Sequence, residues 1–224
     1  QVIDVDLPQV VAFERPAGGE QAVSEAARLL SEAKFPVILS GAGVVLSGAI
    51  PDLVQLAERL DAPVCSNYQH NDSFPGSHPL AMGPLGYNGS KAGMEIIQKA
   101  DVVLALGTRL NPFSTLPGYG IDYWPKDARI IQVDINADRI GLTKKVTVGI
   151  QGDAAKVARG ILGQLSADAG DAGRAERRAL VAQTRSRWAQ ELSSLDHEED
   201  DPGTEWNAGA RGRDGDLMSP RQAW

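Results

Sequence analysis

The stretch "KADVVLALGTRL" (residues 99–110) decides the fold. Its centre, residues 102–106, is apolar throughout, and it ends at Gly107, Thr108 and Arg109. A strand without polar alternation is buried on both faces, which is typical of parallel sheets covered by helices. Because ligands bind beyond the carboxyl ends of such strands, the glycine, hydroxyl and guanidinium that follow this strand indicate a binding site.

Similar segments alternate along the whole chain. Apolar runs that stop at glycine or polar residues predict strands over residues 35–40, 62–67, 101–106, 128–135 and 145–150. Apolar residues at helical spacing predict helices over residues 19–34, 50–60, 90–100 and 153–165. Short buried strands separated by helices predict a doubly wound, Rossmann-like α/β fold with about six mostly parallel strands.

Composition and charge exclude several classes of protein. The 29 acidic side chains outnumber the 22 basic ones, and a net charge of -7 argues against a partner with a phosphate backbone, so we expect no nucleic acid. No uninterrupted apolar run reaches the length of a membrane span, and we expect no membrane partner. The single cysteine, Cys65, can form no internal disulfide. Together with the absence of a signal-peptide pattern, this predicts a cytoplasmic protein.

The chain divides into three parts by composition. Residues 1–18 are predicted to link to a preceding domain, and residues 19–166 form the α/β domain. Residues 167–224 begin with the glycine- and alanine-rich stretch "SADAGDAGRAERR" (residues 166–178), continue as a helix and end as a polar tail. Since the sequence starts with Gln1 and ends in "MSPRQAW", we expect it to be a fragment of a longer polypeptide with further domains on both sides.

Small and polar residues gather after four of the predicted strands. Glycines at such positions most often serve tight turns, and Asp153 in particular has the position of a helix cap. Four such strand ends in one domain indicate a nucleotide site, in which glycines admit a phosphate, Arg109 binds phosphate or stacks on a base, and Asp134 accepts a ribose hydroxyl. The candidate residues are Gly41, Ala42, Gly43, Gly107, Thr108, Arg109, Asp134, Ile135, Gly152 and Asp153.

Other polar residues give weaker signals. The histidines at positions 70, 78 and 197 have no metal-ligand spacing with one another or with Cys65, so we expect no metal site in this chain. His78 is interpreted as part of a packed loop. The proline-bounded loop "LPGYGIDYWP" (residues 116–125) is long for a connection and is either functional or an interface. The acidic run at residues 198–201 is interpreted as solvated.

Four blocks of the sequence carry a family resemblance. In order, they are residues 35–64, 74–90 ("FPGSHPLAMGPLGYNGS"), 100–110 and 128–141 ("ARIIQVDINADRIG"). They resemble the central domain of thiamine-diphosphate-dependent enzymes, the acetolactate synthase-like group that also contains oxalyl-CoA decarboxylase and glyoxylate carboligase. Two longer stretches, residues 66–96 and 108–145, and the tail are most similar to one acyl-transferring member of that family.

The resemblance implies a parent enzyme that uses thiamine diphosphate and Mg²⁺, both bound outside this chain by the two flanking domains. The Gly-Asp-Gly motif of the diphosphate site does not occur here in the expected context, because "RDGDLM" (residues 213–218) lies in the polar tail. The resemblance therefore implies a domain that is not catalytic alone and contains no catalytic residues. It further implies FAD or ADP at the strand ends in some relatives, and a dimeric or tetrameric parent.

Two alternatives remain from the residues alone. The chain could be the central domain of another thiamine-dependent carboligase or decarboxylase, or a free-standing nucleotide-dependent enzyme such as a deacetylase or dehydrogenase. A deacetylase of the zinc-containing kind needs four cysteines, and this chain has one. The pattern around Gly41 and Gly43 also lacks the third glycine of the dinucleotide motif, which weakens the dehydrogenase reading.

Overall fold

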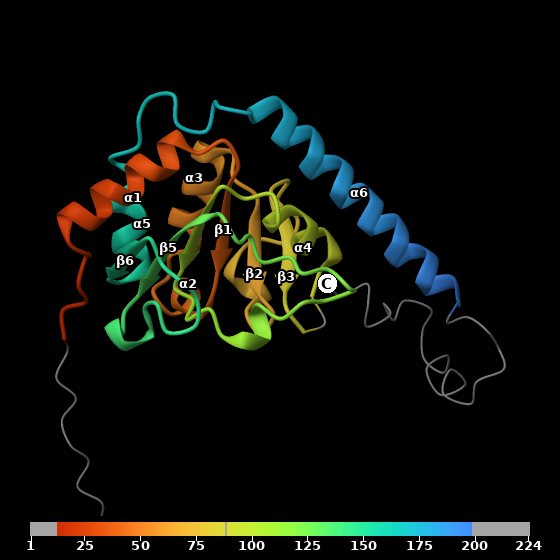
Figure 1. The fold of residues 1–224 in the computed structure, drawn as a ribbon, viewed down its shortest axis with the longest axis horizontal. Helices are drawn as coiled ribbons and strands as arrows, with labels where there is room; N and C mark the ends of the chain where they lie inside the picture. Colours follow the sequence, from red (N-terminus) through yellow and green to blue (C-terminus); the bar gives the residue numbers. More distant parts are fainter. Residues whose placement is uncertain (1–12, 88, 199–224) are drawn as a thin grey trace, which may run out of the picture.

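A six-stranded parallel sheet forms the centre of the protein (Figure 1). The computed structural model describes residues 13–87 and 89–198, without the side chains of residues 195–198. The strands are β1 (Pro36–Ser40), β2 (Val64–Asn67), β3 (Ala81–Leu85), β4 (Val102–Leu106), β5 (Arg129–Asp134) and β6 (Val148–Gln151). Their order in the sheet is β3-β2-β1-β4-β5-β6, and every pairing is parallel. This confirms the predicted fold class.

Helices cover both faces of the sheet. The helices α1 (Glu20–Glu32), α2 (Ala42–Leu46), α3 (Ile50–Leu60) and α5 (Ala154–Leu162) pack on one face, and α4 (Lys91–Ile97) and α6 (Arg174–Glu198) pack on the other (Figure 1). Short 3-10 turns, η1 (Asn71–Ser73), η2 (Pro112–Ser114) and η3 (Ala137–Arg139), lie in the connections. None of the helices in the described ranges is long and apolar enough to cross a membrane.

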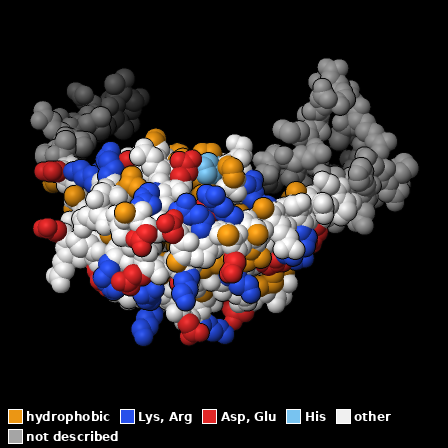
Figure 2. Space-filling view, turned by 90° about the horizontal axis from the view of Figure 1, so that it is seen from above, with side chains coloured by type: hydrophobic (Ala, Val, Ile, Leu, Met, Phe, Trp, Pro, Cys, Tyr) orange, Lys and Arg blue, Asp and Glu red, His pale blue; other side chains and the backbone are white. Residues whose placement is uncertain are grey.

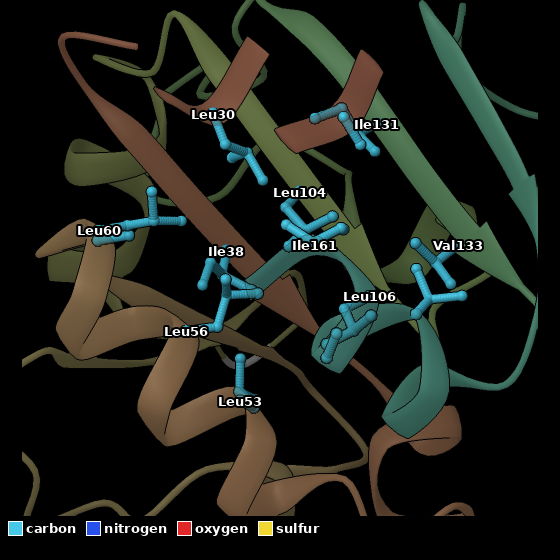
Figure 3. Close-up of a cluster of buried hydrophobic side chains, with 14 of the residues drawn as sticks. Leu30, Ile38, Leu53, Leu56, Leu60, Leu104, Leu106, Ile131, Val133 and Ile161 are labelled. Atoms are coloured by element: carbon cyan, nitrogen blue, oxygen red, sulfur yellow. The ribbon is translucent and has the colours of Figure 1, made fainter. Parts of the chain in front are cut away.

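The apolar runs of the central strands explain this double covering. Successive residues of a strand point to opposite faces, so Val102 and Leu104 of β4 join the core under α1, α3 and α5, while Val103 and Ala105 join the core under α4. Figure 3 shows the first of these cores, where Leu104 meets Ile161 between the sheet and the helices. A strand that must fill two cores cannot alternate with polar residues, which is the pattern that the sequence shows.

Strand β3 was not among the strands expected from the sequence. It lies at one edge of the sheet, and it contains Gly83, with φ of +81°, and Pro84, neither of which favours a strand. Its pairing with β2 also shifts register between Val64 and Cys65. An edge strand accepts such residues because only one of its sides carries ladder hydrogen bonds.

The segment after α5 is attached more closely than its linker-like composition suggests. Arg59 donates hydrogen bonds to the carbonyls of Ala167 (2.8 Å) and Ala169 (2.9 Å). Arg177, with a side-chain exposure of 0%, donates to the carbonyls of Lys34 (2.6 Å), Leu60 (3.1 Å), Asp61 (2.8 Å), Gly170 (2.7 Å) and Ala172 (2.8 Å). Since Leu60 and Asp61 end α3, one buried guanidinium ties the start of α6 to the α/β domain.

The remainder of the predicted tail, residues 199–224, and most of the predicted N-terminal linker, residues 1–12, lie outside the described residues, as does most of the acidic run. Over the face shown in Figure 2, Lys and Arg side chains lie among Asp and Glu side chains. This face therefore presents a mixed surface without the single basic area that phosphate backbones select.

The role of Arg177 gives a first prediction. Replacing Arg177 with Met should lower the free energy of unfolding by about 3 kcal/mol, because the substitution strips buried carbonyls of their donor and leaves the buried carboxylate of Asp61 with less positive charge nearby. Urea unfolding followed by circular dichroism measures the change. The control Arg28→Met removes a half-exposed arginine of α1 whose surface ion pairs are screened by solvent, and it should cost much less. Equal losses in the two variants would contradict the assigned role.

Candidate functional site

A cavity of about 480 Å³ opens at the carboxyl ends of the strands, where the strand order reverses between β1 and β4. In doubly wound sheets this reversal leaves a crevice, because the connections from the two neighbouring strands run to opposite sides. The cavity is lined by Ala42, Gly43, Gly107, Thr108, Arg109, Asp134, Ile135, Gly152 and Asp153. Of the ten candidate residues, Gly41 alone does not line it, although it lies one residue before the lining.

The glycines bring the ends of β1 and β4 into backbone contact. The amide of Gly43 donates to the carbonyl of Gly107 (2.9 Å), and the amide of Gly41 donates to the carbonyl of Leu106 (3.1 Å). A Cβ atom on Gly43 would lie 2.6 Å from the Cα of Gly107, and Gly107 itself has φ of +61°. This close approach requires the glycines whether or not a ligand is bound, and the amides of Gly41 and Gly43 already donate to carbonyls at the end of β4.

Asp153 has the role of a helix cap and also lines the cavity. Its Oδ1 accepts hydrogen bonds from the amides of Ala155 (3.1 Å) and Lys156 (3.2 Å) at the start of α5. Its Oδ2 pairs with Arg15 at 3.0 Å. Burial raises the pKa of Asp153, but the hydrogen bonds from Arg15 and the helix amides outweigh burial and hold this pKa below its usual value. The carboxylate is therefore ionised at neutral pH.

At the neighbouring strand end, β5 contributes Asp134 and Ile135. Asp134 Oδ1 accepts a hydrogen bond from the amide of Asn136 (2.9 Å), which fixes the carboxylate at the rim. The carbonyl of Asp134 accepts from the amide of Gly152 (2.9 Å), so this strand end and the start of the β6–α5 turn are joined. Ile135 is 51% exposed and adds an apolar side chain to the lining.

Arg109 lies between the first cavity and a second one of about 390 Å³, and it lines both. The exposed side chain has no carboxylate within 4 Å among the residues that the structure describes, so no internal ion pair neutralises it there. The following residue, Leu110, is buried and has φ of +52°. Its carbonyl accepts a hydrogen bond from Thr143 Oγ1 (2.6 Å), which holds the turn that presents Arg109.

Several lining residues were not among the candidates. Arg139 and Asn111 line both cavities, and Asn67, His70 and Arg15 line the first. Asn67 ends the predicted second strand, so the strand-end argument that selected Asp134 could have found it. Arg15 precedes the predicted domain, and its position in the sequence carries no signal of this kind.

The other polar features serve packing. His78 Nδ1 accepts a hydrogen bond from the amide of Leu80 (3.1 Å) and its ring packs edge-on against Phe74, as expected for a residue of a packed loop. In the loop of residues 116–125, Tyr123 is buried and donates to the carbonyl of Ser114 (3.0 Å), whereas Tyr119 is 58% exposed. Within residues 13–87 and 89–198, no group of three or more His, Cys, Asp or Glu side chains is placed to hold a metal ion.

The fold and the cavity define a doubly wound α/β domain with its crevice at the topological switch point. Residues 23–161 match the family model described as "Thiamine pyrophosphate enzyme, central domain". The chain belongs to this family, as its sequence blocks predicted.

The curated proteins most similar in sequence indicate a particular enzyme within this family. The chain is 77% identical over 224 residues to a probable sulfoacetaldehyde acetyltransferase of Rhizobium meliloti, covering 100% of this chain and 38% of that protein. It is 75% identical over 224 residues to a sulfoacetaldehyde acetyltransferase of Roseovarius nubinhibens, covering 100% of this chain and 37% of that protein. This enzyme is the acyl-transferring family member that residues 66–96 and 108–145 resemble, so the predicted resemblance is confirmed. The chain thus spans 37–38% of the length of these curated relatives.

Proteins of lower sequence identity to this chain also support the family assignment. A probable acetolactate synthase large subunit of Methanocaldococcus jannaschii is 38% identical over 163 residues, covering 73% of this chain and 27% of that protein. Among solved structures, a benzoylformate decarboxylase from Polynucleobacter necessarius matches with a TM-score of 0.59 and 24% identity, covering 74% of this chain and 30% of that one. At this identity the structural match supports the fold alone.

The lowered pKa of Asp153 predicts a pH dependence. A carboxyl group with a lowered folded-state pKa stabilises the fold above its unfolded pKa, about 3.9, and this stabilisation is lost as the pH falls through the folded pKa. The native chain should therefore be more stable than Asp153→Asn at pH 7, and the difference should shrink below about pH 4. Chemical unfolding at several pH values measures it. Asp127→Asn, at an exposed position, is the control; a native advantage that grows on acidification would contradict the prediction.

Proposed function

We propose that this chain is the central domain of a thiamine-diphosphate-dependent acetyltransferase that converts sulfoacetaldehyde and phosphate to acetyl phosphate and sulfite. The observation that carries the proposal is the identity of 77% and 75% over the whole chain to proteins with the name sulfoacetaldehyde acetyltransferase. The alternative, an acetolactate synthase-like parent, is supported by 38% identity over 163 residues only. The domain is a part of the enzyme and is inactive by itself.

The thiamine chemistry belongs to the flanking domains in this proposal. When bound there, thiamine diphosphate would supply a nucleophilic carbon for the aldehyde and a carrier for the acetyl group, with sulfite as the leaving group and phosphate as the acceptor. Its diphosphate needs Mg²⁺ and metal-ligating carboxylates, and the described residues of this chain contain no such cluster. In this proposal the domain is a scaffold for its neighbours, the parent enzyme is a cytoplasmic homo-oligomer, and no step of the reaction is assigned to residues of this chain.

The cavity gives the domain a second role, as the site of an adenine nucleotide such as ADP or the ADP portion of FAD. Asp134 and Asp153 line only the first cavity and offer acceptors for ribose hydroxyls. Arg109 and Arg139 lie toward the second cavity and offer donors for the diphosphate. A volume of about 480 Å³ lies within the range of small-molecule sites. The free-standing dehydrogenase alternative lacks any supporting observation in the lining.

The activity test compares two lengths of the polypeptide. With sulfoacetaldehyde, phosphate, thiamine diphosphate and Mg²⁺, the chain of residues 1–224 should release no sulfite, because it lacks the groups that bind and activate thiamine. The same chain joined to its flanking domains should release sulfite and form acetyl phosphate. Turnover of pyruvate without sulfite release from sulfoacetaldehyde would favour the acetolactate synthase-like alternative. Sulfite release by residues 1–224 alone would contradict the assignment of the chemistry to other domains.

The nucleotide role predicts an effect of Arg109. Replacing Arg109 with Ala should weaken ADP binding by about 1–3 kcal/mol, the range for losing a hydrogen bond to a charged group, with little change in stability because the side chain is exposed. Isothermal titration and thermal melts with and without millimolar ADP measure both quantities. Arg28→Ala, on α1 away from the cavity, should bind ADP as the native chain does. Coincident melts of the native chain with and without ADP would reject the nucleotide.

A further inference from the structure

Residues 14–18, here called the N-terminal strap, precede the α/β domain, and one of them, Arg15, lines the cavity. The carbonyl of Pro16 accepts a hydrogen bond from the amide of Asp153 (2.8 Å), and Ala17 forms an antiparallel bridge with Gly152. The carbonyl of Arg15 accepts from Lys156 Nζ (2.7 Å). The strap is thus held by the same two residues, Gly152 and Asp153, that line the cavity.

The side chain of Arg15 extends from the strap into the lining. Its Nη1 donates to Asp153 Oδ2 (3.0 Å) and makes a long contact with the carbonyl of Leu46 (3.4 Å). The guanidinium therefore bridges the end of α2 and the start of α5 across the rim. The Arg15 side chain remains 56% exposed, so a flat cationic surface is left open beside the cavity.

The charges and apolar side chains near Arg15 determine which kind of ligand group this side chain can bind. Asp153 already neutralises the guanidinium of Arg15. Arg109 has no carboxylate within 4 Å in the described part of the chain, so Arg15 is a weaker partner for a phosphate than Arg109. Two large aliphatic side chains lie in the same lining, Leu46 with 75% exposure and Ile135 with 51%. A paired guanidinium beside apolar side chains suits an uncharged planar ring, because guanidinium groups stack on aromatic faces.

Ile135 lies on the same side of the cavity as Arg15. Asp134 pairs with Gln151 at the end of the sheet, and the amide of Gly152 donates to the carbonyl of Asp134. Ile135 therefore follows the strand end that adjoins Gly152 and Asp153, to which the strap is bound. This places the apolar lining at the strap and the arginines at positions 109 and 139 toward the second cavity.

From this arrangement we infer that the N-terminal strap clamps the base of a nucleotide, with Arg15 stacked on the ring between Leu46 and Ile135. The inference rests on the proposed nucleotide role of the cavity and adds a binding residue from outside the α/β domain. Binding of the base holds the strap more tightly to Gly152 and Asp153. Because the strap precedes α1, occupancy of the cavity is thereby coupled to the chain that enters from the flanking domain of the proposed parent enzyme.

The test measures binding and strap exchange in the chain of residues 1–224. Three probes are titrated: ADP, adenosine and inorganic pyrophosphate. Hydrogen exchange of the Asp153 amide reports on the strap, because this amide donates to Pro16. The Val64 amide, which donates to the carbonyl of Leu80 (2.8 Å) away from the cavity lining, is the internal reference. ADP and adenosine should each slow exchange of the Asp153 amide relative to that of Val64, and pyrophosphate should not.

Two variants identify the residue responsible. Arg15→Ala should weaken ADP and adenosine binding by about two- to fivefold, the range for an exposed cation–π contact, and should abolish the slowing at Asp153. Arg159→Ala removes an arginine of similar exposure, 60%, that pairs with Asp52 away from the cavity, and should behave as the native chain. Together these results support the base clamp.

Other results overturn it in distinguishable ways. If ADP binds the native chain but leaves the Asp153 amide unchanged, or binds Arg15→Ala equally well, the clamp is wrong while the nucleotide role stands. If pyrophosphate alone slows the exchange, the strap contacts phosphate and the base assignment is wrong. If the native chain binds neither ADP nor adenosine, the clamp and the nucleotide role fail together.

Discussion

The backbone contact between Gly43 and Gly107 is the constraint on which the rest of the site depends. It joins the turn after β1 to the turn after β4 at the point where the strand order reverses, with a hydrogen bond of 2.9 Å and no room for a Cβ atom on either residue. From this contact, α2 continues onto one face of the sheet, where Val44 is in the core, and the segment after Arg109 continues onto the other, where Leu110 is in the core. The crevice between the two departures is the cavity.

The sequence predicted the parts of the fold that depend on burial. The apolar runs around Ile38 and Leu104 predicted strands of a two-sided core, and the amphipathic segments around Leu30, Leu56 and Ile161 predicted the helices that cover it. Figure 3 shows these side chains in one buried cluster. The features that the sequence did not predict depend on pairing at the edge of the sheet and on individual hydrogen bonds. Strand β3 contains Gly83 and Pro84 and is a strand only because β2 offers it an edge.

Among the polar residues, too, some positions could be predicted from the sequence and others could not. The strand-end argument found Asp134 and Asp153 because the carboxyl ends of parallel strands must meet at one side of the sheet. It did not foresee that the amides of Gly41 and Gly43 donate to the carbonyls of Leu106 and Gly107, a contact that itself requires glycine. It could not find Arg15 or the buried Arg177, because each acts through backbone carbonyls and carboxylates that come close only after the chain has folded.

The central claim is that the switch-point cavity binds a nucleotide, and amide chemical shifts measured by NMR during an ADP titration test it most directly. The account predicts saturable shifts confined to the turns after β1, β4, β5 and β6, at residues such as Gly43, Thr108, Ile135 and Ala154, which line the cavity. Shifts that do not saturate, or that fall on α4 and α6, which do not line the cavity, would contradict it.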